Sequence, residues 1–182
     1  MVDLQVVGFH QNLSDGIVRV SMDTPAGPKR QRANRDGIRT TGLEVVASGA
    51  WGRVQYTGDL TLQQAWQIED GSDVRVRPEY EPVAMGGLDM AIPVPWDLSL
   101  SSGYRFVGKQ FCLNAEPGSM DTLSQTHRFD LELRRFFSFE GRSTLANVDA
   151  LVGVTNLTDD AIFDQCGLPQ PGQTFRVQLR LF

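Results

Sequence analysis

Apolar and polar residues alternate strictly along most of this chain, and that alternation constrains its fold more than any other feature. Between residues 53 and 63, the even positions are apolar or small and the odd positions are polar. The same period of two runs through residues 128–139, 147–155 and 175–181, with Arg135 as an exception. Successive side chains of a β-strand point to opposite faces, so this period predicts strands with one apolar and one polar face. Helical periodicity is nearly absent, and we expect an all-β fold.

The alternating stretches are longer than the strands of most soluble sheets. They run for about nine to twelve residues, whereas five or six is usual in soluble proteins and about ten is typical of a transmembrane barrel. The sequence predicts eight strands, over residues 4–20, 37–48, 53–66, 83–92, 96–109, 126–140, 144–156 and 173–182. In the first strand, Gly8, His10 and the Asp15-Gly16 pair blur the alternation, which leaves a bulge or a split into two strands open.

The connections between these strands alternate in length. Long ones are expected at residues 22–36, 67–82, 110–125 and 157–172, and short ones at 49–52, 93–95 and 141–143. Tight periplasmic turns and long extracellular loops produce this alternation in outer-membrane barrels. Aromatic residues gather at both strand ends, as in the two aromatic belts of such barrels. Those at the short turns are Trp51, Trp96, Phe137, Phe139 and Phe182, and those near the long loops are Trp66, Phe106, Phe129 and Phe175. We therefore predict an antiparallel transmembrane β-barrel segment.

Composition excludes several classes of protein. The net charge of -5 gives no basic field to recruit nucleic acid. No apolar run approaches the roughly 20 residues that a membrane-spanning helix needs. The 2 cysteines are too few for a disulfide scaffold or a four-thiolate zinc site. Residues 1–12 lack the features of a signal peptide.

Several motifs give the pattern a family resemblance. Residues 156–159 read N-L-T-D, residues 167–177 read G-L-P-Q-P-G-Q-T-F-R-V, and the chain ends in Phe182. Residues 37–44 read G-I-R-T-T-G-L-E, and residues 78–80 and 105–111 add similar strand motifs. In this order they resemble the C-terminal part of the barrel of TonB-dependent outer-membrane receptors. The resemblance covers residues 1–182 as one domain, without the plug domain and signal peptide of that family.

The resemblance implies a receptor in the cell outer membrane and no enzyme. It implies binding and import of a scarce ligand such as a ferric siderophore, without a cofactor. The implied partners are outer-membrane lipid, the barrel-assembly machinery (with Phe182 as its C-terminal signal), and the TonB complex, reached through the absent plug. A segment of eight strands would leave two unpaired edges, so we expect it to need further strands and to transport nothing alone. A self-contained small barrel and a soluble β-sandwich binding module remain as alternatives.

Strand parity predicts which charged residues face the barrel lumen, where acids and arginines on neighbouring strands can pair. These are Glu44, Arg53, Asp59, Asp89, Arg105, Asp130, Glu132, Arg134, Asp149, Arg176 and Arg180. The lipid-facing residues are predicted to be Leu43, Val45, Val54, Tyr56, Leu60, Leu131, Leu133, Val148, Val152, Val177 and Leu179. In the long loops, the candidates for ligand contact are Lys29, Arg30, Arg32 and Phe111. The basic loop residues could attract an anionic chelate or the phosphates of lipopolysaccharide.

Cys112 and Cys166 lie in two long loops that should emerge on the same external face. Because the cell exterior is oxidising, we expect a disulfide between them, against the alternative of two unrelated cysteines.

The sequence offers little for catalysis. His10 and His127 lack carboxylates at metal or triad spacing, and Ser124 with His127 is the one local candidate for a lipid hydrolase. We predict no catalytic residues and no metal site. Gly86-Gly87 falls inside a predicted strand, where it would allow close backbone packing rather than bind phosphate.

Overall fold

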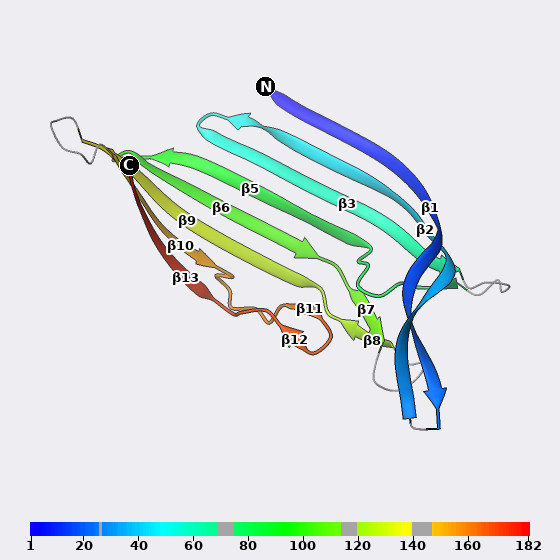
Figure 1. Ribbon diagram of the computed structural model, residues 1–182. Helices are drawn as coiled ribbons and strands as arrows, with labels where there is room; N and C mark the ends of the chain where they lie inside the picture. The colour runs from blue at the N-terminus through cyan, green and yellow to red at the C-terminus, as the bar shows by residue number, and fades with distance from the viewer. Residues whose placement is uncertain (26, 69–74, 114–119, 140–146) are drawn as a thin grey trace.

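A single curved antiparallel sheet dominates the computed structural model, which describes residues 1–182 except 26, 69–74, 114–119 and 140–146 (Figure 1). Each main strand is hydrogen-bonded to the next main strand in the sequence. In order, the strands are β1 (Val2–Thr24), β2 (Gly27–Trp51), β3 (Val54–Ile68), β5 (Ala84–Val94), β6 (Leu98–Val107), β9 (Thr126–Ser138), β10 (Asn147–Thr155) and β13 (Thr174–Leu181). Among the described residues, no helix is long and apolar enough to cross a membrane.

The eight predicted strands are therefore confirmed, and both alternative architectures are wrong. In the described part of the chain the sheet is open, because β1 lies at one edge and β13 at the other. A closed barrel of eight strands would pair these two edges. A β-sandwich would need a second large sheet packed about 10 Å from the first. The other described sheets are two-stranded hairpins.

Short strands lie in the long connections, at one end of the sheet (Figure 1). They are β4 (Arg75–Val76), which pairs with β3, and two hairpins made by β7 (Gln110–Leu113) with β8 (Met120–Leu123) and by β11 (Phe163–Gln165) with β12 (Leu168–Pro169). Short turns such as residues 52–53 and 95–97 lie at the opposite end. The predicted alternation of long and short connections is thus present in the described residues after the first hairpin, while the short connection predicted at residues 141–143 lies outside them. We call the end with the hairpins the rim.

The first long connection was predicted wrongly. Instead of a loop over residues 22–36, β1 and β2 continue as a two-stranded ribbon beyond the sheet, paired from Val2↔Gly49 to Thr24↔Gly27 (Figure 1). The register stays constant along this length, so the bulge considered for the first strand is absent. Gly27, with φ at +102°, closes the ribbon in a conformation that glycine adopts without steric cost.

The sheet has almost no hydrophobic core of its own. Among the described residues, Cys112 and Ile162 are the buried hydrophobic side chains, and both lie in the rim. On the sheet, Leu133 pairs across the strands with Val152, yet these side chains are 39% and 56% exposed. Burial of apolar surface is the main driving force of folding. This sheet therefore needs other material against its apolar face.

At Gly86, β5 approaches β3 closely. A Cβ atom there would come within 2.5 Å of the Asp59 carbonyl oxygen and 3.3 Å of the Leu60 Cα atom. We expect Gly86→Ala to reduce the free energy of unfolding by about 1–3 kcal/mol, the usual cost of overpacking. Gly8→Ala is the matched control, because a Cβ at Gly8 would meet nothing within 4 Å. Urea titration of both variants in lipid vesicles measures the difference, and equal stabilities would contradict this role of Gly86.

Candidate functional site

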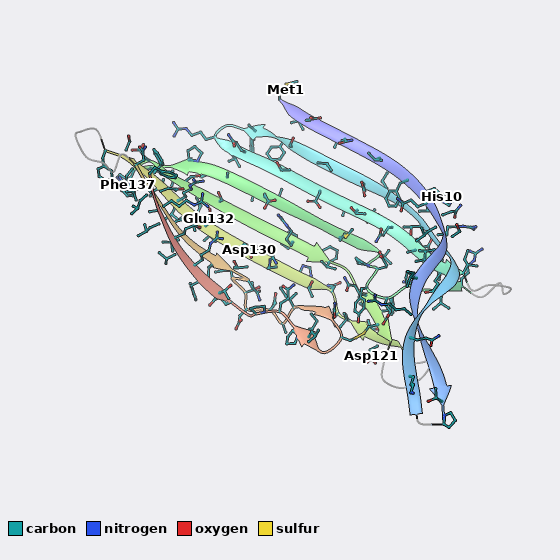
Figure 2. The ribbon with its side chains drawn as sticks, in the orientation of Figure 1. Met1, His10, Asp121, Asp130, Glu132 and Phe137 are labelled. Atoms are coloured by element: carbon teal, nitrogen blue, oxygen red, sulfur yellow. A yellow bond between two sulfur atoms is a disulfide. The ribbon has the colours of Figure 1, made fainter. Side chains whose placement is uncertain are left out.

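The predicted lumen-facing charges share the polar face of the sheet. Strand register places Thr57, Asp89, Gly103 and Asp130 in one row across four neighbouring strands. Two residues further along β9, Glu132 lies opposite Ser101 on one side and Gly153 on the other. Figure 2 shows Asp130 and Glu132 near the middle of the sheet. Their common parity puts these side chains on one face.

Arginines and carboxylates on this face form ion pairs between strands. Arg105 contacts Asp89 at 2.7 Å, and Arg176 contacts Glu132 at 2.7 Å. The Arg134 guanidinium donates two hydrogen bonds to the Asp149 carboxylate, from Nε at 2.7 Å and from Nη2 at 2.6 Å. Arg128 pairs within β9 with Asp130 at 3.2 Å. The structure therefore joins most of the charges that parity assigned to this face.

Glycines make room for these pairs. A Cβ at Gly87 would lie 2.9 Å from Arg105 Nη1 and 3.0 Å from Asp59 Oδ1. A Cβ at Gly103 would lie 3.2 Å from Asp89 Oδ1. Close approach of neighbouring groups is a usual reason for glycine inside a strand.

Four of the predicted lumenal residues stand apart from these pairs, and one of them, Asp59, lies opposite Gly87 in register. Arg53 lies in the turn at residues 52–53, one residue before β3 begins, so its lumen-facing position stays a prediction. Glu44 lies in register with Val7 and Thr61 and makes no ion pair within the described residues. Arg180 lies opposite Asp149 in register.

A hollow of about 420 Å³ lies over the polar face. Asp89, Asp130, Glu132 and Arg176 contribute to its lining. A second cavity, of about 330 Å³, lies where the polar face meets the rim. Residues from the sheet, the β7–β8 hairpin and the connections line this rim cavity, among them Tyr80, Arg105, Gln110, Arg128, Ile162 and Phe163.

Gln110 is one of the polar residues of the rim cavity that sequence reasoning missed. Its Oε1 atom is buried and has no hydrogen-bond partner in the described part of the chain. Such an orphaned acceptor usually costs free energy unless a water or ligand satisfies it. No sequence signal singled out Gln110, because residues 110–125 were expected to form a loop and the β7–β8 hairpin was not predicted.

Three long connections are tied together at the rim. Cys112 and Cys166 form a disulfide with their Cα atoms 6.3 Å apart, which joins the β7–β8 hairpin to the connection that holds β11 and β12. The Tyr80 amide donates a 2.9 Å hydrogen bond to the Phe111 carbonyl. The Arg77 guanidinium lies 5.3 Å from the centre of the Phe111 ring. Phe111, expected to contact ligand, thus makes contacts within the rim.

The other predicted loop candidates lie on the ribbon. Lys29 and Arg32 are exposed residues of β2, and Arg30 belongs to the same strand. Phe182 lies at the opposite end of the sheet, where its backbone exchanges hydrogen bonds with Asn147 at 3.1 and 3.3 Å. Its side chain is 60% exposed.

The N-L-T-D motif builds a turn that leaves β10. Asn156 is 1% exposed, has φ at 53°, and donates from its backbone amide to Asp130 Oδ1 at 3.0 Å. Its side-chain Nδ2 donates to the Asp160 carbonyl at 2.9 Å. Asp159 Oδ1 accepts a 2.7 Å hydrogen bond from the amide of Gln173, just before β13. The motif therefore joins both ends of this connection to the sheet.

Asn156→Ala should loosen that turn. The variant removes a buried hydrogen bond and places alanine at a positive φ, at an expected cost of about 1–3 kcal/mol. Amide exchange at Leu157, whose N–H donates to the Phe129 carbonyl at 2.7 Å, should become faster. Thr158→Ala is the control, because it removes an exposed hydrogen bond to Asp160. An unchanged exchange rate at Leu157 would contradict the role given to Asn156.

Each histidine contacts a hydroxyl group on a neighbouring strand. His10 Nδ1 lies 2.8 Å from Thr41 Oγ1, and His127 Nδ1 lies 2.8 Å from the Tyr104 hydroxyl. Within the described residues, no group of three or more His, Cys, Asp or Glu side chains is arranged to hold a metal ion.

Comparison with known proteins relates the fold to one group of transporters. No family model and no curated protein matches the chain. Among solved structures, the ferric-catecholate import receptor Fiu of Escherichia coli matches with 19% identity and a TM-score of 0.69, covering 98% of this chain and 25% of that one. The ferripyoverdine receptor of Pseudomonas aeruginosa matches with 16% identity and a TM-score of 0.70, covering 99% and 25%. The siderophore receptor PirA of Acinetobacter baumannii matches with 13% identity and a TM-score of 0.69, covering 98% and 29%.

These neighbours are TonB-dependent receptors of the outer membrane. The chain has the fold of part of their barrels and spans about a quarter of their length.

Proposed function

We propose that this chain forms the C-terminal wall of the barrel of a TonB-dependent receptor in the outer membrane. One observation carries the proposal: an open single-layer sheet with an apolar face, an ion-paired polar face and its long connections gathered at one end. In that setting the apolar face contacts outer-membrane lipid, the polar face lines the lumen, and the rim faces the cell exterior.

A membrane accounts for the missing core. The exposed large apolar side chains of β9, β10 and β13 are 39% to 76% exposed, so water would be a poor solvent for this face. Lipid would cover it at no cost, because outer-membrane barrels present just such an apolar band. The ion pairs of the other face suit a water-filled lumen, in which charged side chains stay partly hydrated.

The two sheet edges indicate further strands. The outer sides of β1 and β13 present backbone groups that lipid cannot satisfy. We propose that they pair with the remaining strands of a larger barrel, placed in the membrane by the barrel-assembly machinery with the strand that ends in Phe182 as its signal. The TonB complex would act through a plug domain in that barrel.

The rim cavity is the proposed place of ligand contact in this chain. Arg105 and Arg128 line it, and each guanidinium has donors beyond those that contact its paired carboxylate. Gln110 adds an unpartnered oxygen, which can accept a hydrogen bond from a ligand hydroxyl or amide. This chemistry suits a small anionic chelate such as a ferric siderophore, bound and passed inward with no bond chemistry. Two of the structural neighbours are described as a ferric-catecholate import receptor and a receptor bound to ferripyoverdine.

Binding of a labelled chelate tests this proposal. Outer membranes from cells that produce this chain as part of the larger barrel should retain a radioactive ferric tricatecholate above the level of membranes without that barrel. Gln110→Leu and Arg128→Gln should each lower that retention severalfold. Arg180→Gln removes the same charge away from the rim cavity and should leave it unchanged. Retention equal to that of membranes without the chain would refute ligand contact, and absence of the chain from the outer-membrane fraction would refute the membrane assignment.

A further inference from the structure

The apolar face of β1, β2 and β3 changes character sharply near the rim. Register places Gly8, Leu43 and Leu62 in one row across the three strands. The next row of the same parity holds His10, Thr41 and Gln64, and the row after that holds Asn12, Arg39 and Trp66. Rows of one parity are about 6–7 Å apart along a strand. The change from leucine to charged and polar residues therefore marks the edge of the apolar band, and Figure 2 labels His10 near the point where the ribbon leaves the sheet.

Arg39 lies at this edge without a carboxylate partner. It is exposed, and its Nε atom donates a 3.0 Å hydrogen bond to Asn12 Oδ1. Among the described residues it makes no ion pair, so both terminal nitrogens of its guanidinium keep free donors.

Arg77 lies beside the same tryptophan. Its guanidinium is 5.6 Å from the centre of the Trp66 ring, and Trp66 is the register partner of Arg39. Arg77 also forms no ion pair with any described residue. On the polar face, by contrast, Arg105, Arg134 and Arg176 each contact a carboxylate within 2.7 Å. Two arginines that form no ion pair among the described residues thus flank one indole on the lipid-facing side of the rim.

We propose that Arg39, Arg77 and Trp66 bind the phosphate-bearing headgroup of an outer-leaflet lipid. This inference rests on the proposed function, which places the Leu43 side of the sheet in lipid and the rim outside. Guanidinium groups match phosphate geometry and bind it through paired hydrogen bonds. Tryptophan favours the level of the headgroups, where its ring is apolar and its N–H is hydrated. The site lies on the face opposite the polar lining, so its occupant is a lipid of the surrounding leaflet rather than transported ligand.

The experiment uses photocrosslinking in outer membranes from cells that produce the full chain as part of the larger barrel. A benzoylphenylalanine replaces Gln64, an exposed residue in the row between Leu62 and Trp66. The crosslinked lipid is released and its phosphate content is measured by mass spectrometry. The yield of crosslinked phosphate-bearing lipid is compared between the chain with both arginines and the double variant Arg39→Gln, Arg77→Gln. Arg53→Gln, in the turn at the opposite end of the sheet, is the matched control.

Phosphate-bearing lipid crosslinked at Gln64 should fall about tenfold or more in the double variant, since one arginine near an anionic surface strengthens attachment roughly fivefold. Arg53→Gln should leave the yield unchanged. An equal yield in the double variant and the unaltered chain would overturn the headgroup site. A second probe at Leu133, in the apolar band, reports membrane insertion separately: acyl-chain crosslinks there support the proposed function, and their absence overturns both proposals.

Discussion

Leu133→Arg is expected to destabilise the chain in a membrane by about 2–4 kcal/mol, the cost of an arginine on the lipid face near the middle of the bilayer. Leu133 lies in register between Leu100 of β6 and Val152 of β10, within the apolar face. Its neighbour Glu132 points to the other face, where it pairs with Arg176. Glu132→Gln should cost less than about 1 kcal/mol, because a hydrated ion pair contributes little. Urea titration in vesicles, followed by tryptophan fluorescence, measures both.

Phe136→Arg is the control for the size and charge of the new side chain. Phe136 is 52% exposed, shares the parity of Glu132 and lies opposite Asp149 in register. An arginine there would enter the polar lining and should be tolerated. Equal costs at Leu133 and Phe136 would show that the two faces have been assigned wrongly.

Removal of the disulfide should produce the second large effect. Cys112 and Cys166 are separated by 54 residues, and a crosslink of that length contributes about 4 kcal/mol in the chain-entropy account. In the double variant Cys112→Ser, Cys166→Ser, the connections should separate and the amide of Tyr80, which donates to Phe111, should exchange faster. Amide exchange at the centre of β9 should not change, because the backbone hydrogen bonds of β9 to β6 and β10 do not depend on the contacts among the rim connections.

Thiol titration provides an independent check of this bond. The exported chain, denatured without reductant, should show no reactive thiol, because its 2 cysteines are joined to each other. Two thiols per chain would contradict the bridge and, with it, the view that the rim acts as one connected unit.

The sheet could be predicted from sequence because each of its strands carries the same simple signal. Along β9, Phe129, Leu131 and Leu133 alternate with Asp130 and Glu132, and the pleat turns that alternation into two faces without help from distant contacts. The ion pairs followed from the same parity, since opposite charges on adjacent strands come within reach of each other.

The ribbon and the rim were harder to predict, for physical reasons. Pro25, Gly27 and Pro28 are turn formers and favoured a loop over residues 22–36, but cross-strand pairing extends both strands through most of that stretch. Pairing is a property of two segments together, so a pattern read along one of them misses it. Gln110 and Asn156 owe their burial to hairpins and turns folded over the sheet. Arg53 was assigned to a strand because the alternation continues one residue into the turn.

Cysteine accessibility along β9 tests the central claim most directly. Single cysteines are introduced at each position from 128 to 134 of the chain in outer membranes, with the native disulfide intact, and labelled with a water-soluble maleimide. Positions 128, 130, 132 and 134 should react, because they face a hydrated lumen, and positions 129, 131 and 133 should be protected by lipid. Uniform labelling of all seven positions, or labelling with the opposite parity, would contradict a membrane-spanning wall with these two faces.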